Sequence, residues 1–164
     1  MSQLQKYLDT TGVILVVIDT DQRVSFINKT GCQILGYSDK EIIGKNWFDN
    51  FLPKSIRGKM KNIFQQLTAD KLEPFKYYEN PVVTKSGEER VIAWFNTVLR
   101  DESGKITGTL SYGRDITEHK QAEEALRESE ERYRALLELG ERTGEAVVML
   151  QDDERGVGMH VFVS

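Results

Sequence analysis

The segment TKSGEERVIAWFNTVLRDESGKITGTLSYGRDITE (residues 84–118) decides the fold. Within it, β-branched and aromatic residues run from Arg90 to Arg100 and again from Ile106 to Gly113, and a glycine-containing turn precedes each run. Short turns with glycine between such runs are typical of β-hairpins. Together with the preceding run from Phe75 to Thr84, the segment predicts three consecutive antiparallel strands.

Two shorter apolar runs lie nearer the N-terminus, from Val13 to Asp19 and from Val24 to Ile27. The polar residues 20–23 separate them, which predicts a first hairpin. With the three later strands, this hairpin makes five strands in two groups.

A helical block is predicted between the two groups of strands. Asn28 and Gly36 bracket a short helix, and Ser38 and Glu41 have the spacing of a capping box at the start of a second one. The segment KSIRGKMKNIFQQL (54–67) then places apolar residues at steps of four and three, which predicts one amphipathic helix. The order predicts an α+β domain with its helices on one face of a five-stranded antiparallel sheet.

A charged segment, DITEHKQAEEALRESEERYRALLELGE (115–141), follows the last strand. Asp115 and Glu118 have capping-box spacing, so we expect a helix to start directly behind that strand. Positions 115, 119, 122, 126, 129, 133 and 136 advance by alternating steps of four and three, which favours a two-stranded coiled coil. The segment is therefore either a dimerising signalling helix or a solvated helix that packs on its own domain.

Residues 143–155 repeat the pattern of residues 11–23, with Thr, Gly, Val, Asp and Arg identical at matching positions. The apolar positions of the two segments coincide as well. The repeat predicts that residues 142–164 form the truncated first hairpin of a second copy of the domain.

Composition narrows the class of protein. The 164 residues include 22 Lys+Arg and 26 Asp+Glu, giving a net charge of −4 and a pI of about 5.3, which argues against a nucleic-acid partner. The single cysteine, Cys32, cannot form an internal disulfide, so a reducing, cytoplasmic compartment is expected. No apolar run is long enough for a membrane segment, and the N-terminus lacks a signal-peptide pattern.

Several short motifs resemble those of a PAS sensory domain of the S-box type with a PAC-like C-terminal end. In order they are Ile27-Asn28, Leu35-Gly36-Tyr37, Glu41-Ile42-Ile43-Gly44, Asn46-Trp47-Phe48, Thr84-Lys85-Ser86-Gly87, Gly108, and Arg114-Asp115-Ile116-Thr117-Glu118. The run ALRESEERYR (125–134) resembles helices that join tandem PAS domains in histidine kinases. The resemblance implies an N-terminal helical cap or tail (1–9), a PAS domain (10–118), a linker or coiled-coil helix (119–141), and the truncated second copy (142–164).

The resemblance implies a sensory or regulatory module of a signal-transduction protein, such as a two-component histidine kinase or a cyclase. Such a module senses a small molecule or a conformational input and relays it through the C-terminal helix, with a homodimer expected through that helix. The alternative is a ligand-free dimerisation or scaffold module. No phosphate-binding glycine loop, HExxH, CxxC or serine nucleophile motif is present, so we expect neither a catalytic nor a metal site in this chain.

The resemblance also implies a hydrophobic cavity between the sheet and the helices. Alternation places Ile92, Trp94 and Asn96 on one face of their strand, and Gly108, Leu110 and Tyr112 on one face of the last strand. The resemblance assigns both faces to the interior, with Gly108 leaving room beside Trp94. The predicted ligand pocket is Trp47, Phe64, Ile92, Trp94, Asn96, Leu110 and Tyr112. The alternative is that these side chains fill the space themselves.

Known PAS cofactors match the residues poorly, so the cofactor stays unknown. The stretch Gly44-Lys45-Asn46-Trp47 lacks the cysteine that follows Gly-Arg-Asn in flavin-binding light sensors, which disfavours a flavin adduct. Residues 54–70 contain no histidine, which disfavours histidine-ligated haem. Cys32 is expected to be a small core residue rather than a chromophore anchor.

Three residues at the start of the C-terminal helix form the predicted signal relay: Asp115, Thr117 and Glu118. Asp115 is expected to cap the helix with its carboxylate, and Thr117 to tie the first turn to the sheet. A ligand that shifts the sheet would then tilt or rotate the helix.

Overall fold

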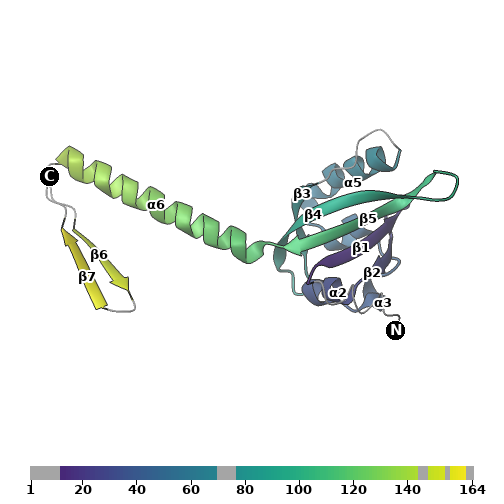
Figure 1. The fold of residues 1–164 in the computed structure, drawn as a ribbon, viewed down its shortest axis with the longest axis horizontal. Coiled ribbons are helices and arrows are strands. Elements are labelled where there is room, and N and C mark those ends of the chain that lie inside the picture. Colours follow the sequence, from purple (N-terminus) through teal and green to yellow (C-terminus); the bar gives the residue numbers. More distant parts are fainter. Residues whose placement is uncertain (1–11, 70–76, 144–147, 154–155, 162–164) are drawn as a thin grey trace. The chain divides into compact units, whose positions relative to one another are not determined.

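The computed structural model describes residues 12–69, 77–143, 148–153 and 156–161 (Figure 1). The predicted N-terminal cap or tail (1–9) lies outside the described residues. The chain divides into two compact units, Met1–Glu118 and His119–Ser164. No helix among the described residues is long and apolar enough to cross a bilayer.

The first unit is built on a five-stranded antiparallel sheet in the order β2-β1-β5-β4-β3. Its strands are β1 (Ile14–Asp19), β2 (Val24–Ile27), β3 (Tyr78–Val83), β4 (Glu89–Arg100) and β5 (Ile106–Asp115). The predicted five-stranded α+β architecture is confirmed. The central strand β5 pairs with β1 on one side and with β4 on the other.

Four helices connect β2 to β3 and lie on one face of the sheet (Figure 1). They are α2 (Lys29–Leu35), α3 (Asp39–Ile42), α4 (Trp47–Phe51) and α5 (Lys54–Thr68). Helix α4 was not predicted from the sequence. It is only five residues long and begins where the Asn46 side chain accepts a hydrogen bond from the Asp49 N–H.

Predicted capping residues set the ends of α2 and α3. The Asn28 side-chain Oδ1 accepts from the Gly31 N–H, and Gly36 ends α2 in the left-handed conformation at φ 77°. At the start of α3, the Ser38 N–H donates to Glu41 Oε2 at 2.9 Å, as the predicted capping box requires.

The core lies between the sheet and the helices. Side chains of β1 alternate between buried and half-buried, with Ile14, Val16 and Ile18 inward. From the helical side, Trp47 packs edge-on against Trp94 of β4, with ring centroids 5.8 Å apart. This aromatic contact fixes α4 against the sheet.

The predicted inner face of β5 is wrong. Cross-strand partners point to the same face, and the register pairs Asn96 with Ser111 and Phe95 with Tyr112. Leu110 and Tyr112 therefore lie on the outer face with Phe95. The residues at the inner positions of β5 are small or polar, whereas large apolar residues of the strand face outward. This arrangement is the reverse of the usual one, in which apolar residues are buried.

Two glycines of β5 explain its close packing. A Cβ on Gly113 would lie 2.6 Å from the Trp94 ring, so Gly113, rather than the predicted Gly108, makes room for that indole. A Cβ on Gly108 would lie 2.3 Å from the Ile18 carbonyl oxygen. Gly108 thus allows close approach of two main chains.

The long helix α6 (Thr117–Thr143) begins directly behind β5, as predicted. Asp115 is the last residue of β5, and its Oδ1 accepts from the Thr117 N–H at 2.9 Å, so the predicted capping of α6 by this carboxylate is confirmed. The reciprocal bond from Glu118 is not among the hydrogen bonds of the described residues. The strand continues because Asp115 still pairs with Ile92 of β4.

In the second unit, β6 (Val148–Asp153) and β7 (Gly156–Val161) pair as an antiparallel hairpin. That this hairpin begins a second copy of the domain stays a prediction.

Candidate functional site

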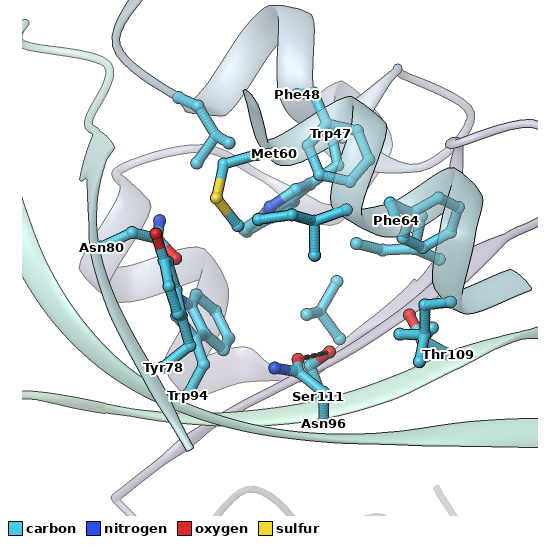
Figure 2. Close-up of a pocket in the computed structure, with 15 residues that line it drawn as sticks. Trp47, Phe48, Met60, Phe64, Tyr78, Asn80, Trp94, Asn96, Thr109 and Ser111 are labelled. Carbon is cyan, nitrogen blue, oxygen red and sulfur yellow. Dashed lines mark hydrogen bonds between the residues drawn. The ribbon is translucent and has the colours of Figure 1, made fainter. Parts of the chain in front are cut away.

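A cavity of about 70 Å³ lies between the inner face of the sheet and helices α4 and α5 (Figure 2). Fifteen residues line it: Val16, Ile18, Trp47, Phe48, Leu52, Met60, Ile63, Phe64, Leu67, Tyr78, Asn80, Trp94, Asn96, Thr109 and Ser111.

The two sides of the cavity differ in polarity. The helical side is apolar and includes Trp47, Met60 and Phe64 (Figure 2). The sheet side includes Asn96 and Ser111, and the Ser111 hydroxyl donates to Asn96 Oδ1 at 2.6 Å. An apolar wall opposite a few fixed polar groups is typical of small-molecule sites.

Four of the seven predicted pocket residues line this cavity: Trp47, Phe64, Trp94 and Asn96. Ile92 is fully buried in the core but is not among the lining residues. Leu110 and Tyr112 lie on the outer face, where the Tyr112 ring stacks on Phe95 with centroids 4.7 Å apart. Their predicted place in the pocket is wrong, because the register of β5 turns them away from the helices.

The polar residues that β3 and β5 contribute to the cavity were not predicted from the sequence; they include Asn80, Thr109 and Ser111. Polar residues at alternating strand positions are typical of a solvated face, so hydrophobicity alone gave no signal. Cross-strand pairing with Asn96 would have identified Ser111 as its neighbour on the same face.

A group of hydrogen bonds, here called the clamp, holds the start of α6 to β4. It consists of Val91, Asp115, Ile116 and Thr117. Asp115 Oδ1 accepts from the Thr117 N–H at 2.9 Å and from the Thr117 hydroxyl at 2.5 Å. The same hydroxyl accepts from the Val91 N–H at 2.9 Å, and the Ile116 N–H donates to the Val91 carbonyl at 2.9 Å. The first turn of α6 is thereby bonded to Val91 near the start of β4.

Arg90 adds a charged contact to the clamp. Its Nη1 donates to Asp115 Oδ2 at 3.2 Å, and its Nη2 donates to Glu88 at 3.3 Å. Asp115 first and Glu88 second raise the pKa of the Arg90 guanidinium above its usual value. Of the predicted relay residues, Asp115 and Thr117 are therefore brought together, whereas Glu118 is exposed and takes no part in these bonds.

Other reactive residues lie apart from the cavity. Cys32 is half-buried and packs against the core from α2. Within the described ranges, no group of three or more His, Cys, Asp or Glu residues is placed to hold a metal ion.

A family model described as the PAS fold matches residues 8–121, which is most of the chain. The chain belongs to the PAS family. This PAS domain is therefore a sensory module, and its predicted identity from sequence motifs is confirmed. No curated protein matches the chain.

Solved PAS structures share the fold at low sequence identity. A PAS domain from Colwellia psychrerythraea is 22% identical, with a TM-score of 0.63, and the match covers 71% of this chain and 96% of that one. A sensory box histidine kinase/response regulator from Burkholderia thailandensis is 20% identical, with a TM-score of 0.59, over 82% of this chain and 100% of that one.

The PAS domain of the quorum-sensing receptor RpfR from Cronobacter turicensis, in complex with BDSF, is 18% identical. Its TM-score is 0.56, and the match covers 65% of this chain and 96% of that chain. At these identities, the comparisons show the shared fold of the domain.

Proposed function

We propose that this PAS domain senses a small molecule in its cavity and relays occupancy to α6 through the clamp. One observation supports the proposal above others: strands β4 and β5 contribute both the Asn96–Ser111 pair in the cavity and the Val91–Asp115 end of the sheet. A ligand that spreads or shears these two strands would change the geometry of the clamp.

The energies required are small. A net intramolecular hydrogen bond contributes about 0.5–1.5 kcal/mol, and coupling between sites is typically about 1–3 kcal/mol. Loss or weakening of one or two of the clamp's hydrogen bonds is therefore enough to shift α6 between two arrangements.

Similar structures support this class of function. They include a sensory box histidine kinase/response regulator and a quorum-sensing receptor PAS domain in complex with BDSF. We propose by this similarity that the domain works in the cytoplasm as part of a two-component histidine kinase or a related signalling protein.

A second candidate function, a dimerisation or scaffold module, is favoured by the surface of α6. Leu126, Tyr133 and Leu136 of the predicted coiled-coil seam are exposed. Arg127 forms ion pairs with Glu124 and Glu131 at spacings of three and four residues, on the opposite side of the helix from the seam. Exposed apolar residues in the C-terminal part of the seam, opposite a charged side, fit a homodimer through the linker helix.

A cavity-filling variant tests the relay without any ligand. Ser111→Val adds apolar volume inside the cavity on β5, whereas Thr97→Val changes an exposed position of β4 and serves as the control. We expect Ser111→Val to shift the NMR amide signals of Val91 and Thr117 in the whole chain, and Thr97→Val to leave them in place. If Ser111→Val shifts only the amide signals of residues that line the cavity, the relay is refuted and the scaffold function is favoured.

A further inference from the structure

Two polar groups of the cavity have unused hydrogen-bonding capacity. Thr109 is only 2% exposed, yet its hydroxyl has no hydrogen-bond partner among the described residues, and it borders the cavity. Asn96 uses its carbonyl to accept from Ser111, while its amide N–H2 group has no partner within the described part of the chain. Both groups border the cavity, so they are free to bond to a ligand there.

Thr109 and Asn96 are close enough for one ligand to contact both. The register pairs Thr109 with Val98 and Ser111 with Asn96, which makes Thr109 and Asn96 diagonal neighbours on the same face. Diagonal neighbours across antiparallel strands are about 7–8 Å apart, within the span of a single polar head group and its hydrogen bonds. Figure 2 shows both side chains on the sheet side of the cavity.

The described residues that line the cavity offer no counter-charge to a ligand. All fifteen lining residues are uncharged, and the helical side is formed by Trp47, Phe48, Met60 and other apolar groups. A carboxylate or ammonium group would lose its hydration there without gaining an ion-pair partner, which is strongly unfavourable. The occupant must therefore be neutral.

The size of the cavity sets the size of the occupant. About 70 Å³ holds roughly five water-sized groups. A short alkyl chain of four or five carbons with one polar end fits that space, with the chain against α5 and the polar end at the sheet.

We propose that the cavity binds a short, uncharged aliphatic molecule with a head group that both donates and accepts hydrogen bonds, such as a primary amide. The head group accepts from the Asn96 amide and bonds to the Thr109 hydroxyl, and the alkyl chain packs against Phe64 and Met60. This assignment rests on the proposed sensory function and specifies the ligand class for the same site.

Pentanamide and pentanoate test this assignment directly, since they have the same number of heavy atoms and nearly the same shape. At pH 7 pentanoate is ionised, whereas pentanamide is neutral. Each is titrated into the ¹⁵N-labelled whole chain, and the amide signals of Asn96, Thr109 and Ser111 are followed by NMR. We expect pentanamide to bind at least about tenfold more tightly than pentanoate.

Thr109→Val provides the matched variant, because valine has nearly the same shape as threonine and lacks the hydroxyl. We expect the variant to fold with unchanged or higher stability, since it removes a buried hydroxyl without a partner, and to bind pentanamide several-fold more weakly. Thr107→Val, at an exposed position of the same strand, is expected to leave binding unchanged.

Two results would overturn the ligand class. Equal or tighter binding of pentanoate would show that charge is accepted, and the sensory function would stand. Binding of neither compound at millimolar concentration would also refute the assignment, while the Ser111→Val experiment, which needs no ligand, would decide the relay separately.

Discussion

Two helices of this PAS domain begin directly behind a strand, and the residues that hold their first turns differ in burial and charge. Asn28 at the start of α2 is 2% exposed and neutral. Its Oδ1 accepts from the N–H groups of Leu15 and Gly31, and its Nδ2 donates to the Val13 carbonyl at 2.9 Å. Asp115 at the start of α6 is 20% exposed in its side chain and pairs with the charged Arg90.

The difference separates two kinds of joint between a strand and a helix: a fixed joint at Asn28 and an adjustable joint at Asp115. Breaking the Asn28 bonds would leave main-chain groups unpaired away from water, so that joint resists small perturbations. The Asp115 carboxylate and the Arg90 guanidinium can exchange partners with water, so their pairing adds little energy and is easily biased. We infer that α2 belongs to the rigid frame of the domain, whereas the start of α6 is suited to respond.

The largest expected effect is at the fixed joint. Asn28→Ala removes three hydrogen bonds and a helix cap, and we expect the free energy of unfolding to fall by about 3 kcal/mol. Urea denaturation measures this change. Asn46→Ala, which removes the more exposed cap of α4, is the control and is expected to cost about 1 kcal/mol. Equal losses in the two variants would break the distinction between buried and exposed joints.

At the adjustable joint, Asp115→Ala is expected to cost about 1–2 kcal/mol, concentrated in the first turn of α6. Hydrogen exchange of the Thr117 amide should speed up about tenfold, while amides of α2 keep their rates. Asp115→Asn retains an acceptor for Thr117 and removes the charge, so it should restore most of the protection. An unchanged Thr117 rate in Asp115→Ala would show that the carboxylate does not hold the helix.

The ion pair of the clamp is expected to contribute less than its hydrogen bonds. Arg90→Gln should lower the free energy of unfolding by about 0.5 kcal/mol, because the guanidinium is 35% exposed. Urea denaturation at low and high salt distinguishes the cause, since the loss should shrink as salt screens the pair. A salt-independent loss would indicate lost packing of the Arg90 stem.

The smallest effect is expected at a third helix start, where Glu41 of α3 bonds to Lys85 and to Ser38. These bonds lower the pKa of Glu41 from 4.5 to about 2, with Lys85 as the main cause. The Glu41 carboxylate is therefore protonated near pH 4.5 in the unfolded chain, but only near pH 2 in the folded chain. As pH falls from 4.5 to about 2, the contribution of Glu41 to stability is lost. Urea denaturation across this range should show a shallower pH dependence for Glu41→Gln than for the wild type. Parallel curves would refute the prediction.

Local signals in the sequence predicted most element boundaries. Asn28, Gly36 and Ser38 act through bonds to residues a few positions away, so their roles do not depend on the rest of the fold. Glycine turns fixed the three long strands in the same way. Asp115 acts in the same local way, because its carboxylate accepts from the Thr117 N–H two residues further on.

The cavity was harder to predict, because its polar side comes from residues that alternate like a solvated face. Thr109 and Ser111 point inward, and the larger apolar Leu110 and Tyr112 point outward. The inner face of β5 follows from its register with β4, which includes an irregularity between Leu99 and Arg100, just before the turn. Such a register depends on pairing across strands, which hydrophobic periodicity does not report.

A double-mutant cycle between the cavity and the clamp tests the central claim most directly. Ser111 and Asp115 are four residues apart on β5, about 13 Å along an extended strand, a distance at which independent substitutions usually add. Hydrogen exchange of the Thr117 amide in Ser111→Val, Asp115→Ala and the double variant gives their interaction free energy. The relay predicts an interaction of at least about 0.5 kcal/mol, whereas additivity within about 0.3 kcal/mol would contradict it.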